Sequence, residues 1–168
     1  MTRIFLLSDT HGHMDERILH YAAKADEIWH AGDMGNLEVC DQLQRHAPLR
    51  GVYGNIDGDK VRREYPEELY FQCEEVLIYM IHIGGYPGRY SPKARQGLTQ
   101  KKADLFISGH SHILKVVNDP KRKLLHMNPG ACGQHGFHQM RTALQFVVDG
   151  KEFKELQVVE FGKRGKLK

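Results

Sequence analysis

Apolar and polar positions alternate in a strand–helix rhythm along the first third of the chain. An unbroken apolar run within residues 3–8 predicts a buried strand, and apolar residues at helical spacing predict a helix over 15–25. The same rhythm continues with a strand at 27–30, a helix at 37–46 and a strand at 49–53. Such a series predicts a parallel sheet with right-handed crossover connections.

The remainder of the chain is richer in strands. A hairpin is predicted from 68–72 and 75–83, turning at Cys73-Glu74, and a helix over 91–102, with Ser91 as N-cap and Pro92 as its first residue. Further strands are predicted at 105–108, 114–118, 123–127, 144–148 and 153–160. Asp149-Gly150 is a hairpin-turn signal between the last two. Many strands and few helices favour two packed sheets with helices outside, an α/β (α+β) class.

Length and composition predict an ordinary globular protein. The chain has 168 residues, 40% hydrophobic and 27% charged, which suits a single domain over residues 1–162. The net charge of +3 is small, and much of the basic excess falls in residues 163–168. We interpret this basic C-terminal tail as a solvated end rather than a nucleic-acid-binding arm.

The cysteines and the first apolar run bear on the compartment. Three widely spaced cysteines (Cys40, Cys73 and Cys132) form neither a zinc pattern nor a disulfide framework. The opening apolar run is too short for a signal peptide or a membrane span, and it soon meets Asp9. We therefore expect a cytoplasmic protein without membrane attachment.

Polar side chains that can bind metal follow five successive predicted strands. These donors are Asp9 and His11, Asp33, Asn55, His82, and His110 and His112. A glycine directly precedes Asp33, Asn55 and His110, where it lets the backbone turn sharply and approach a site closely. Because ligands gather at the carboxyl ends of strands in open α/β sheets, these donors predict a metal site.

The donor types narrow the choice of metal. Imidazoles favour manganese, iron, nickel or zinc over calcium, and carboxylates keep a harder ion such as Mn²⁺ acceptable. Two ions about 3.5–4 Å apart can clamp the attacking and leaving oxygens of a phosphoryl displacement. We expect two divalent ions, Mn²⁺ first, with Zn²⁺, Ni²⁺ and Fe²⁺ as alternatives.

The order of these blocks resembles the calcineurin-like metallophosphoesterase superfamily. D-x-H, G-D, G-N, a lone histidine and G-H-x-H run in the family's order over residues 9–112, and the turn at Asn128-Pro129-Gly130 resembles its small bacterial and archaeal phosphodiesterase branch. The resemblance implies a four-layer α-β-β-α sandwich of two mixed sheets. It also implies that Asp9, His11 and His112 hold one ion, that Asn55, His82 and His110 hold the other, and that Asp33 bridges them.

The sequence departs from the wider family at one position. Many members carry a histidine after the G-N asparagine, taken to protonate the leaving group, whereas this chain has Ile56 followed by Asp57. His13 could replace it as the acid, or it could be a solvated histidine at a helix start; both interpretations stay open. The catalytic candidates are Asp33, Asn55 and His13. Asp57 is expected to support the loop, and Asn128 to fix the Pro129-Gly130 turn.

The favoured function is hydrolysis of small phosphoester substrates by a two-metal phosphodiesterase or phosphatase. One alternative is a non-catalytic interaction scaffold like the small retromer subunit, which a replaced ligand would favour; all seven donors are present here. Another is a nuclease, which should need a broad basic surface, and only scattered basic pairs such as Arg62-Arg63 occur. Nucleic acid is therefore not the favoured partner, and homo-oligomerisation stays open.

Overall fold

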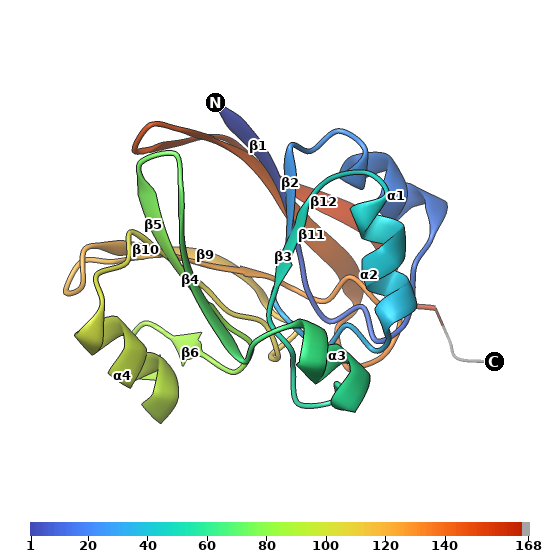
Figure 1. Cartoon of the computed structure of the whole chain (residues 1–168), viewed down its shortest axis with the longest axis horizontal. Coiled ribbons are helices and arrows are strands. Elements are labelled where there is room, and N and C mark those ends of the chain that lie inside the picture. The colour runs from blue at the N-terminus through green and yellow to red at the C-terminus, as the bar shows by residue number, and fades with distance from the viewer. Residues whose placement is uncertain (166–168) are drawn as a thin grey trace.

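Two five-stranded sheets form the centre of the molecule (Figure 1). The computed structural model describes residues 1–165. The first sheet has the order β12 (Glu152–Lys163), β11 (Met140–Asp149), β1 (Thr2–Leu7), β2 (Glu27–His30) and β3 (Leu49–Gly51). The second has the order β4 (Glu68–Cys73), β5 (Val76–Ile81), β8 (Leu105–Ile107), β10 (Leu124–Pro129) and β9 (Leu114–Asp119). A small ribbon pairs β6 (Gly85–Tyr86) with β7 (Arg89–Tyr90).

The alternation of side chains along each strand explains why a sheet packs against the other sheet on one face and against helices on the other. Successive side chains of a strand point to opposite faces. Ile4 and Leu6 of β1 therefore pack in the core between the sheets, whereas Phe5 and Leu7 pack in a second cluster with Ile18. Helices α1 (Glu16–Ala22) and α2 (Leu37–Gln44) bury their apolar residues in that second cluster. Strand β1 is buried on both faces, which accounts for its unbroken apolar sequence.

The other sheet is covered in the same way. Helix α4 (Pro92–Gln100) places Ala94 and Leu98 against Tyr79, Ile81 and Phe106. Figure 1 shows α4 on the far side of the molecule from α1 and α2. The predicted α-β-β-α class is therefore confirmed, as is the N-cap at Ser91, whose Oγ accepts a hydrogen bond from Ala94 N at 3.2 Å.

Both sheets are mixed, and each contains a parallel core. Strands β1, β2 and β3 are parallel, as are β5, β8 and β10, while β11, β12, β4 and β9 pair antiparallel. The carboxyl ends of parallel strands meet at one edge of their sheet. In each sheet, the loops that bear the predicted donors lie at this edge.

Three features differ from the sequence prediction. Helix α3 (Asp59–Glu64) was not predicted, because only Val61 of its six residues is buried and it has no apolar stripe. The ribbon β6–β7 was also missed, since each strand has only two residues. Strand β11 begins at Met140 rather than at 144, because its first residues pair with the end of β12.

Two residues of the predicted solvated tail are held by contacts in the structure. Lys163 still pairs with Met140 in β12, and Arg164 Nε donates to the carbonyl oxygen of His138 at 3.0 Å. The rest of that tail, residues 166–168, lies outside the described residues. Within residues 1–165, no helix is long and apolar enough to cross a membrane.

Candidate metal centre

The loops that follow β1, β2, β3, β5 and β8 bring all seven predicted donors together. Two groups form, each with its ligand atoms within 4.8 Å of one another: Asp9, His11 and His112 in the first, and Asp33, His82 and His110 in the second. Asn55 joins the second group, because its Oδ1 lies 3.0 Å from His110 Nδ1. The structure thus brings the seven donors together in two groups, with Asp33 in the second; which residues hold an ion stays a prediction.

Asp9 is held by one carboxylate oxygen and presents the other to the site. Its Oδ2 accepts hydrogen bonds from Ser8 Oγ at 2.6 Å and from the backbone N–H of His110 at 3.1 Å. Its Oδ1 is buried and accepts no hydrogen bond within the described residues. His112 Nε2 lies 3.2 Å from that oxygen. A buried anionic oxygen in this position matches what a cation needs.

Asp33 is arranged in the same manner but faces both groups. Its Oδ1 accepts the backbone N–H of Ile56 at 3.1 Å. Its Oδ2 lies 3.2 Å from His82 Nε2 and 3.4 Å from His11 Nε2. A single oxygen therefore stands between a member of the second group and a member of the first.

The rings of His11, His82 and His112 point their Nε2 atoms toward these oxygens. His82 Nδ1 donates to the carbonyl oxygen of Ala31 at 2.7 Å, which leaves Nε2 without a proton in the neutral ring. Among residues 1–165, neither His82 Nε2 nor His11 Nε2 has a hydrogen-bond partner, and both are buried. A backbone carbonyl behind a histidine is the usual support of a metal ligand. The unsatisfied donor atoms fit divalent ions such as those predicted.

The charges of the site reinforce this fit. Burial opposes ionisation of Asp9, but the adjacent His11 and His112 rings hold its pKa below the ordinary value. Burial likewise opposes ionisation of Asp33, and His11 and His82 lower its pKa. In return, Asp33 and Asp9 raise the pKa of His11 to about 9. The carboxylates thus hold positive charge at the place where ions are predicted.

The backbone is unusual at the donors themselves. Five of the seven have a positive φ, a region that residues other than glycine seldom adopt: Asp9 (55°), His11 (47°), Asp33 (56°), His110 (70°) and His112 (62°). Sparsely populated backbone conformations of this kind cluster at functional sites. In the loops after β1 and β8, both donors of each loop adopt this conformation.

The glycines next to the donors serve close approach, as the sequence predicted. A Cβ added to Gly54 would collide with the Asp33 carboxylate, and one added to Gly109 would collide with Ser8 Oγ. Neither glycine has a positive φ. At these two positions the missing side chain, and not the backbone freedom, is what the site requires.

Asp57 ties two donor loops together. It is 2% exposed, and its carboxylate accepts three backbone N–H groups: those of Met34 at 3.2 Å, Gly35 at 2.8 Å and Gly54 at 2.8 Å. The loop after β2, which bears Asp33, is thereby fixed to the loop after β3, which bears Asn55. The expectation of a supporting role agrees with this geometry.

His30 performs a similar task, which the sequence did not reveal. Its Nδ1 accepts the backbone N–H of Gly32 at 3.1 Å, so its Nε2 carries the proton and donates to Thr10 Oγ1 at 3.0 Å. Thr10 Oγ1 then donates to the carbonyl oxygen of Met34 at 2.9 Å. This buried chain joins the loops of Asp9 and Asp33, and burial lowers the pKa of His30 to about 4. Its only sequence signal is its place at the end of a buried strand.

The remaining candidates lie around the donors. His13 Nε2 is 2.8 Å from Asp15 Oδ2, and Asp15 also caps α1 and accepts from Arg141 at 2.8 Å. His135 is exposed and its ring centroid lies 5.0 Å from that of His11. Asn128 fixes its turn as expected, since its Oδ1 accepts from Gly130 N at 3.0 Å. It also supports the last donor loop, because its Nδ2 donates to Gly109 O at 3.1 Å.

Comparison with known proteins identifies relatives of this chain. Residues 2–151 match the model of the calcineurin-like phosphoesterase superfamily domain. A probable metallophosphoesterase from Methanothermobacter thermautotrophicus is 28% identical over 135 residues, which are 76% of this chain and 76% of that protein. A second probable metallophosphoesterase, from Methanocaldococcus jannaschii, is 28% identical over 134 residues, covering 76% of this chain and 67% of that protein.

Solved structures share the fold. The structure of a novel archaeal phosphodiesterase has a TM-score of 0.75 at 19% identity, covering 94% of this chain and 99% of its own. Wild-type Vps29 from Entamoeba histolytica, complexed with zinc, has a TM-score of 0.74 at 15% identity, covering 95% of this chain and 99% of its own.

Proposed function

Because this chain belongs to the calcineurin-like phosphoesterase superfamily, we propose that it is a metal-dependent phosphodiesterase that uses two divalent ions. One observation carries the proposal: Asp33 Oδ2, which belongs to the second donor group, lies 3.2 Å from His82 Nε2 and also 3.4 Å from His11 Nε2 of the first group. A single bound ion would need only one of the two groups, whereas two ions joined by one carboxylate would need both.

We assign the ligands by the groups that the chain brings together. Asp9, His11 and His112 hold one ion, Asn55, His82 and His110 hold the other, and Asp33 bridges them. Mn²⁺ suits this mixture of carboxylate, amide and imidazole donors, with Zn²⁺, Fe²⁺ and Ni²⁺ as alternatives. When bound, such ions supply Lewis acidity toward the phosphate oxygens and an activated hydroxide.

The protein's own residues orient the reaction. Asp33 and Asn55 lie in the two loops that Asp57 joins, so the phosphate would be bound against a fixed framework. His13 stands at the side of His11, and both border an open cavity of about 560 Å³. Since Asp15 already engages His13 Nε2, delivery of a proton from that nitrogen would require the pair to separate.

The residue after Asn55 predicts the substrate preference. Ile56 cannot donate a proton, and loss of a general acid costs about 10²–10⁴ in rate when the leaving group is poor. Esters of acidic alcohols, such as aryl phosphodiesters, should therefore react faster than alkyl monoesters.

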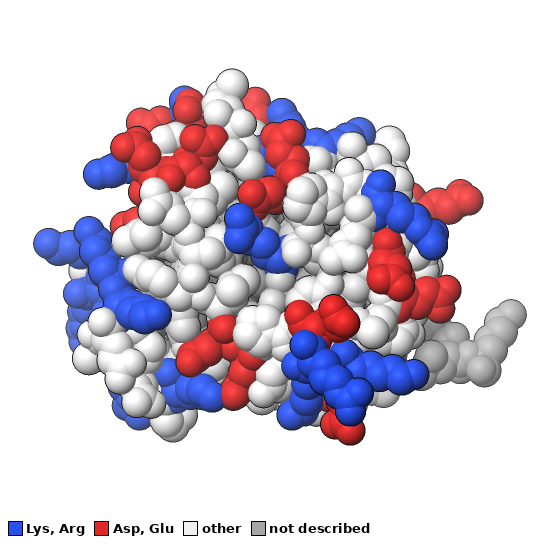
Figure 2. Space-filling model, viewed as in Figure 1, with Lys and Arg blue, Asp and Glu red and all other residues white. Residues whose placement is uncertain are grey.

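The alternative functions have less support. All seven donors are present, which disfavours a scaffold that has lost its site. On the face in Figure 2, basic side chains form separate groups, divided by uncharged and acidic side chains, so this face lacks the broad basic surface expected of a nuclease. The three cysteines are free and buried, which is compatible with the cytoplasmic location that we propose.

The decisive experiment supplies single metals to metal-stripped protein and measures hydrolysis of bis(p-nitrophenyl) phosphate and of alkyl monoesters. We expect activity only with added metal, highest for the aryl diester, and two ions per chain by elemental analysis. A His112→Ala variant serves as the control for contaminating hydrolases. Equal rates for wild type and this variant, or saturation at one ion, would contradict the proposal.

A further inference from the structure

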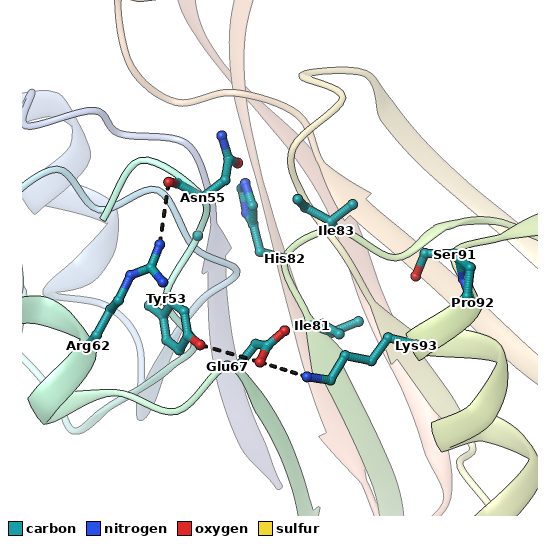
Figure 3. Close-up of a pocket in the computed structure, with 11 residues that line it drawn as sticks. Tyr53, Asn55, Arg62, Glu67, Ile81, His82, Ile83, Ser91, Pro92 and Lys93 are labelled. Carbon is teal, nitrogen blue, oxygen red and sulfur yellow. Dashed lines mark hydrogen bonds and ion pairs between the residues drawn. The ribbon is translucent and has the colours of Figure 1, made fainter. Parts of the chain in front are cut away.

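A cavity of about 540 Å³ opens beside Asn55 and His82, away from the first donor group (Figure 3). This volume lies within the usual range for small-molecule sites. In Figure 3, Asn55 and His82 lie at one end of the cavity, and the pair of Glu67 and Lys93 closes the other. A group attached to a phosphate at the donors could therefore extend into it.

The walls of the cavity are mainly apolar. Ile81 and Ile83, which flank His82 in sequence, line one side together with Pro92, and the ring of Tyr53 lines the other. Ile83 is 45% exposed although it is large and apolar. An exposed apolar side chain next to the polar donors is suited to contact an apolar part of a ligand.

Two of the three charged residues of the cavity pair with each other: Lys93 Nζ lies 2.6 Å from Glu67 Oε2. The third, Arg62, keeps its positive charge. Its Nε donates to the carbonyl oxygen of Asp57 at 2.6 Å, and its guanidinium lies over the Tyr53 ring at 4.5 Å. The Tyr53 ring and the apolar walls favour a planar ring as the bound group.

We propose that this cavity binds the retained ester group of a phosphodiester, and that this group is a planar aromatic ring. The inference rests on the proposed function. A diester has two ester groups, and each donor group borders a cavity: one at His82, and a more open, histidine-lined one at His11. His13, the candidate acid for the leaving group, lines the cavity at His11. We therefore assign that cavity to the leaving group and the cavity at His82 to the retained ring.

The test keeps the leaving group constant, so that its acidity cannot explain a difference. Methyl, phenyl and thymidine 5′ esters of p-nitrophenyl phosphate all release p-nitrophenol. We expect kcat/KM for the phenyl ester to exceed that of the methyl ester by about tenfold, mainly through KM, because a ring leaves water. A still faster thymidine ester would identify the ring as a nucleobase, and a slower one would identify a simple aryl group.

Ile83→Ala should reduce the phenyl-to-methyl ratio about threefold to tenfold. Ile113→Ala is the matched control, since Ile113 follows His112 as Ile83 follows His82, is 59% exposed and does not line the cavity. It should leave the ratio within about twofold. An unfolding curve for each variant checks that it folds.

Binding provides a measurement independent of turnover. Phenylphosphonate should bind metal-loaded protein more tightly than methylphosphonate in calorimetry, and Ile83→Ala should remove most of that difference. If hydrolysis occurs without a phenyl preference, or if both isoleucine variants act alike, the subsite is overturned and the proposed function stands. If no diester is hydrolysed but the phenyl preference in binding is present, the function fails and the subsite stands.

Discussion

Asp57 offers a test of how the donor loops are held that does not depend on catalysis. Asp57→Asn keeps the shape of the side chain but replaces one acceptor oxygen by an NH₂ group, which cannot accept. Oδ1 receives one N–H, from Gly35, and Oδ2 receives two, from Met34 and Gly54. The amide should therefore turn its NH₂ toward Gly35, which loses the fewest bonds.

The magnitude follows from these contacts. A hydrogen bond to a charged group contributes about 1.5–3 kcal/mol, and a buried N–H left unpaired costs a similar amount. At least one such bond is lost and two become neutral, so we expect a loss of about 2–4 kcal/mol in the free energy of unfolding. That is a large share of the roughly 5–15 kcal/mol available to a domain.

Urea unfolding of the metal-stripped protein measures this loss, and calorimetric titration with Mn²⁺ measures its effect on the site. We expect weaker binding of the ions, because Asp33 and Asn55 lie in the two loops that Asp57 joins. Asp41→Asn is the control, since Asp41 is exposed in α2 and carries the same charge; it should change stability by less than about 0.5 kcal/mol. A loss below about 1 kcal/mol in Asp57→Asn, with unchanged Mn²⁺ affinity, would refute the reasoning.

Three further predictions concern the donors and their neighbours. Asp33→Asn should abolish activity and weaken binding of both ions, since it removes the negative charge from a side chain whose Oδ2 lies 3.2 Å from His82 Nε2 and 3.4 Å from His11 Nε2; near wild-type turnover with two ions bound would show that Asp33 is not the bridge. In the metal-stripped protein, the raised pKa of His11 stabilises the fold fully below the unfolded-state value of about 6.5, and this contribution should be lost as the pH rises through about 9. Urea titrations in EDTA between pH 6 and 10 would detect this loss of stability. Mn²⁺ binding at pH 7.5 should also release protons, measured by calorimetry in buffers of different ionisation enthalpy. Binding without proton release would count against a raised pKa of His11. Ile56→His should raise hydrolysis of alkyl monoesters more than that of aryl diesters, and an equal effect on both, in a folded and metal-loaded variant, would mean that protonation does not limit the reaction.

The sequence reveals the strands and their donors because both follow from local pattern. A buried strand needs an apolar run, and the polar residues that directly follow it, such as Asp9 and His82, must lie at the sheet edge. Helix α3 was missed for the same reason, since its charged residues carry no period. The class was predictable because the order of strands and helices leaves few arrangements.

A supporting role for Asp57 could be predicted, but the partners of the supporting residues could not, since these contacts are distant in sequence. The N–H groups of Met34 and Gly35 lie 23 and 22 residues from Asp57, and Thr10 lies 20 from His30. No spacing rule connects such pairs. The cavity beside His82 also combines residues from the loop after β3 and from α4, so only the packed structure reveals it.

The five donors with a positive φ lower the stability of the fold in order to serve the proposed metal site. Each L-residue in that conformation costs about 1–2 kcal/mol relative to a right-handed one, less for Asp and His than for bulky side chains. A glycine substitution would remove that cost but would also remove a donor, whether at Asp9, His11, Asp33, His110 or His112. Selection for thermal stability alone should therefore replace these residues first. A stability-guided redesign of this chain should therefore leave all five donors unchanged.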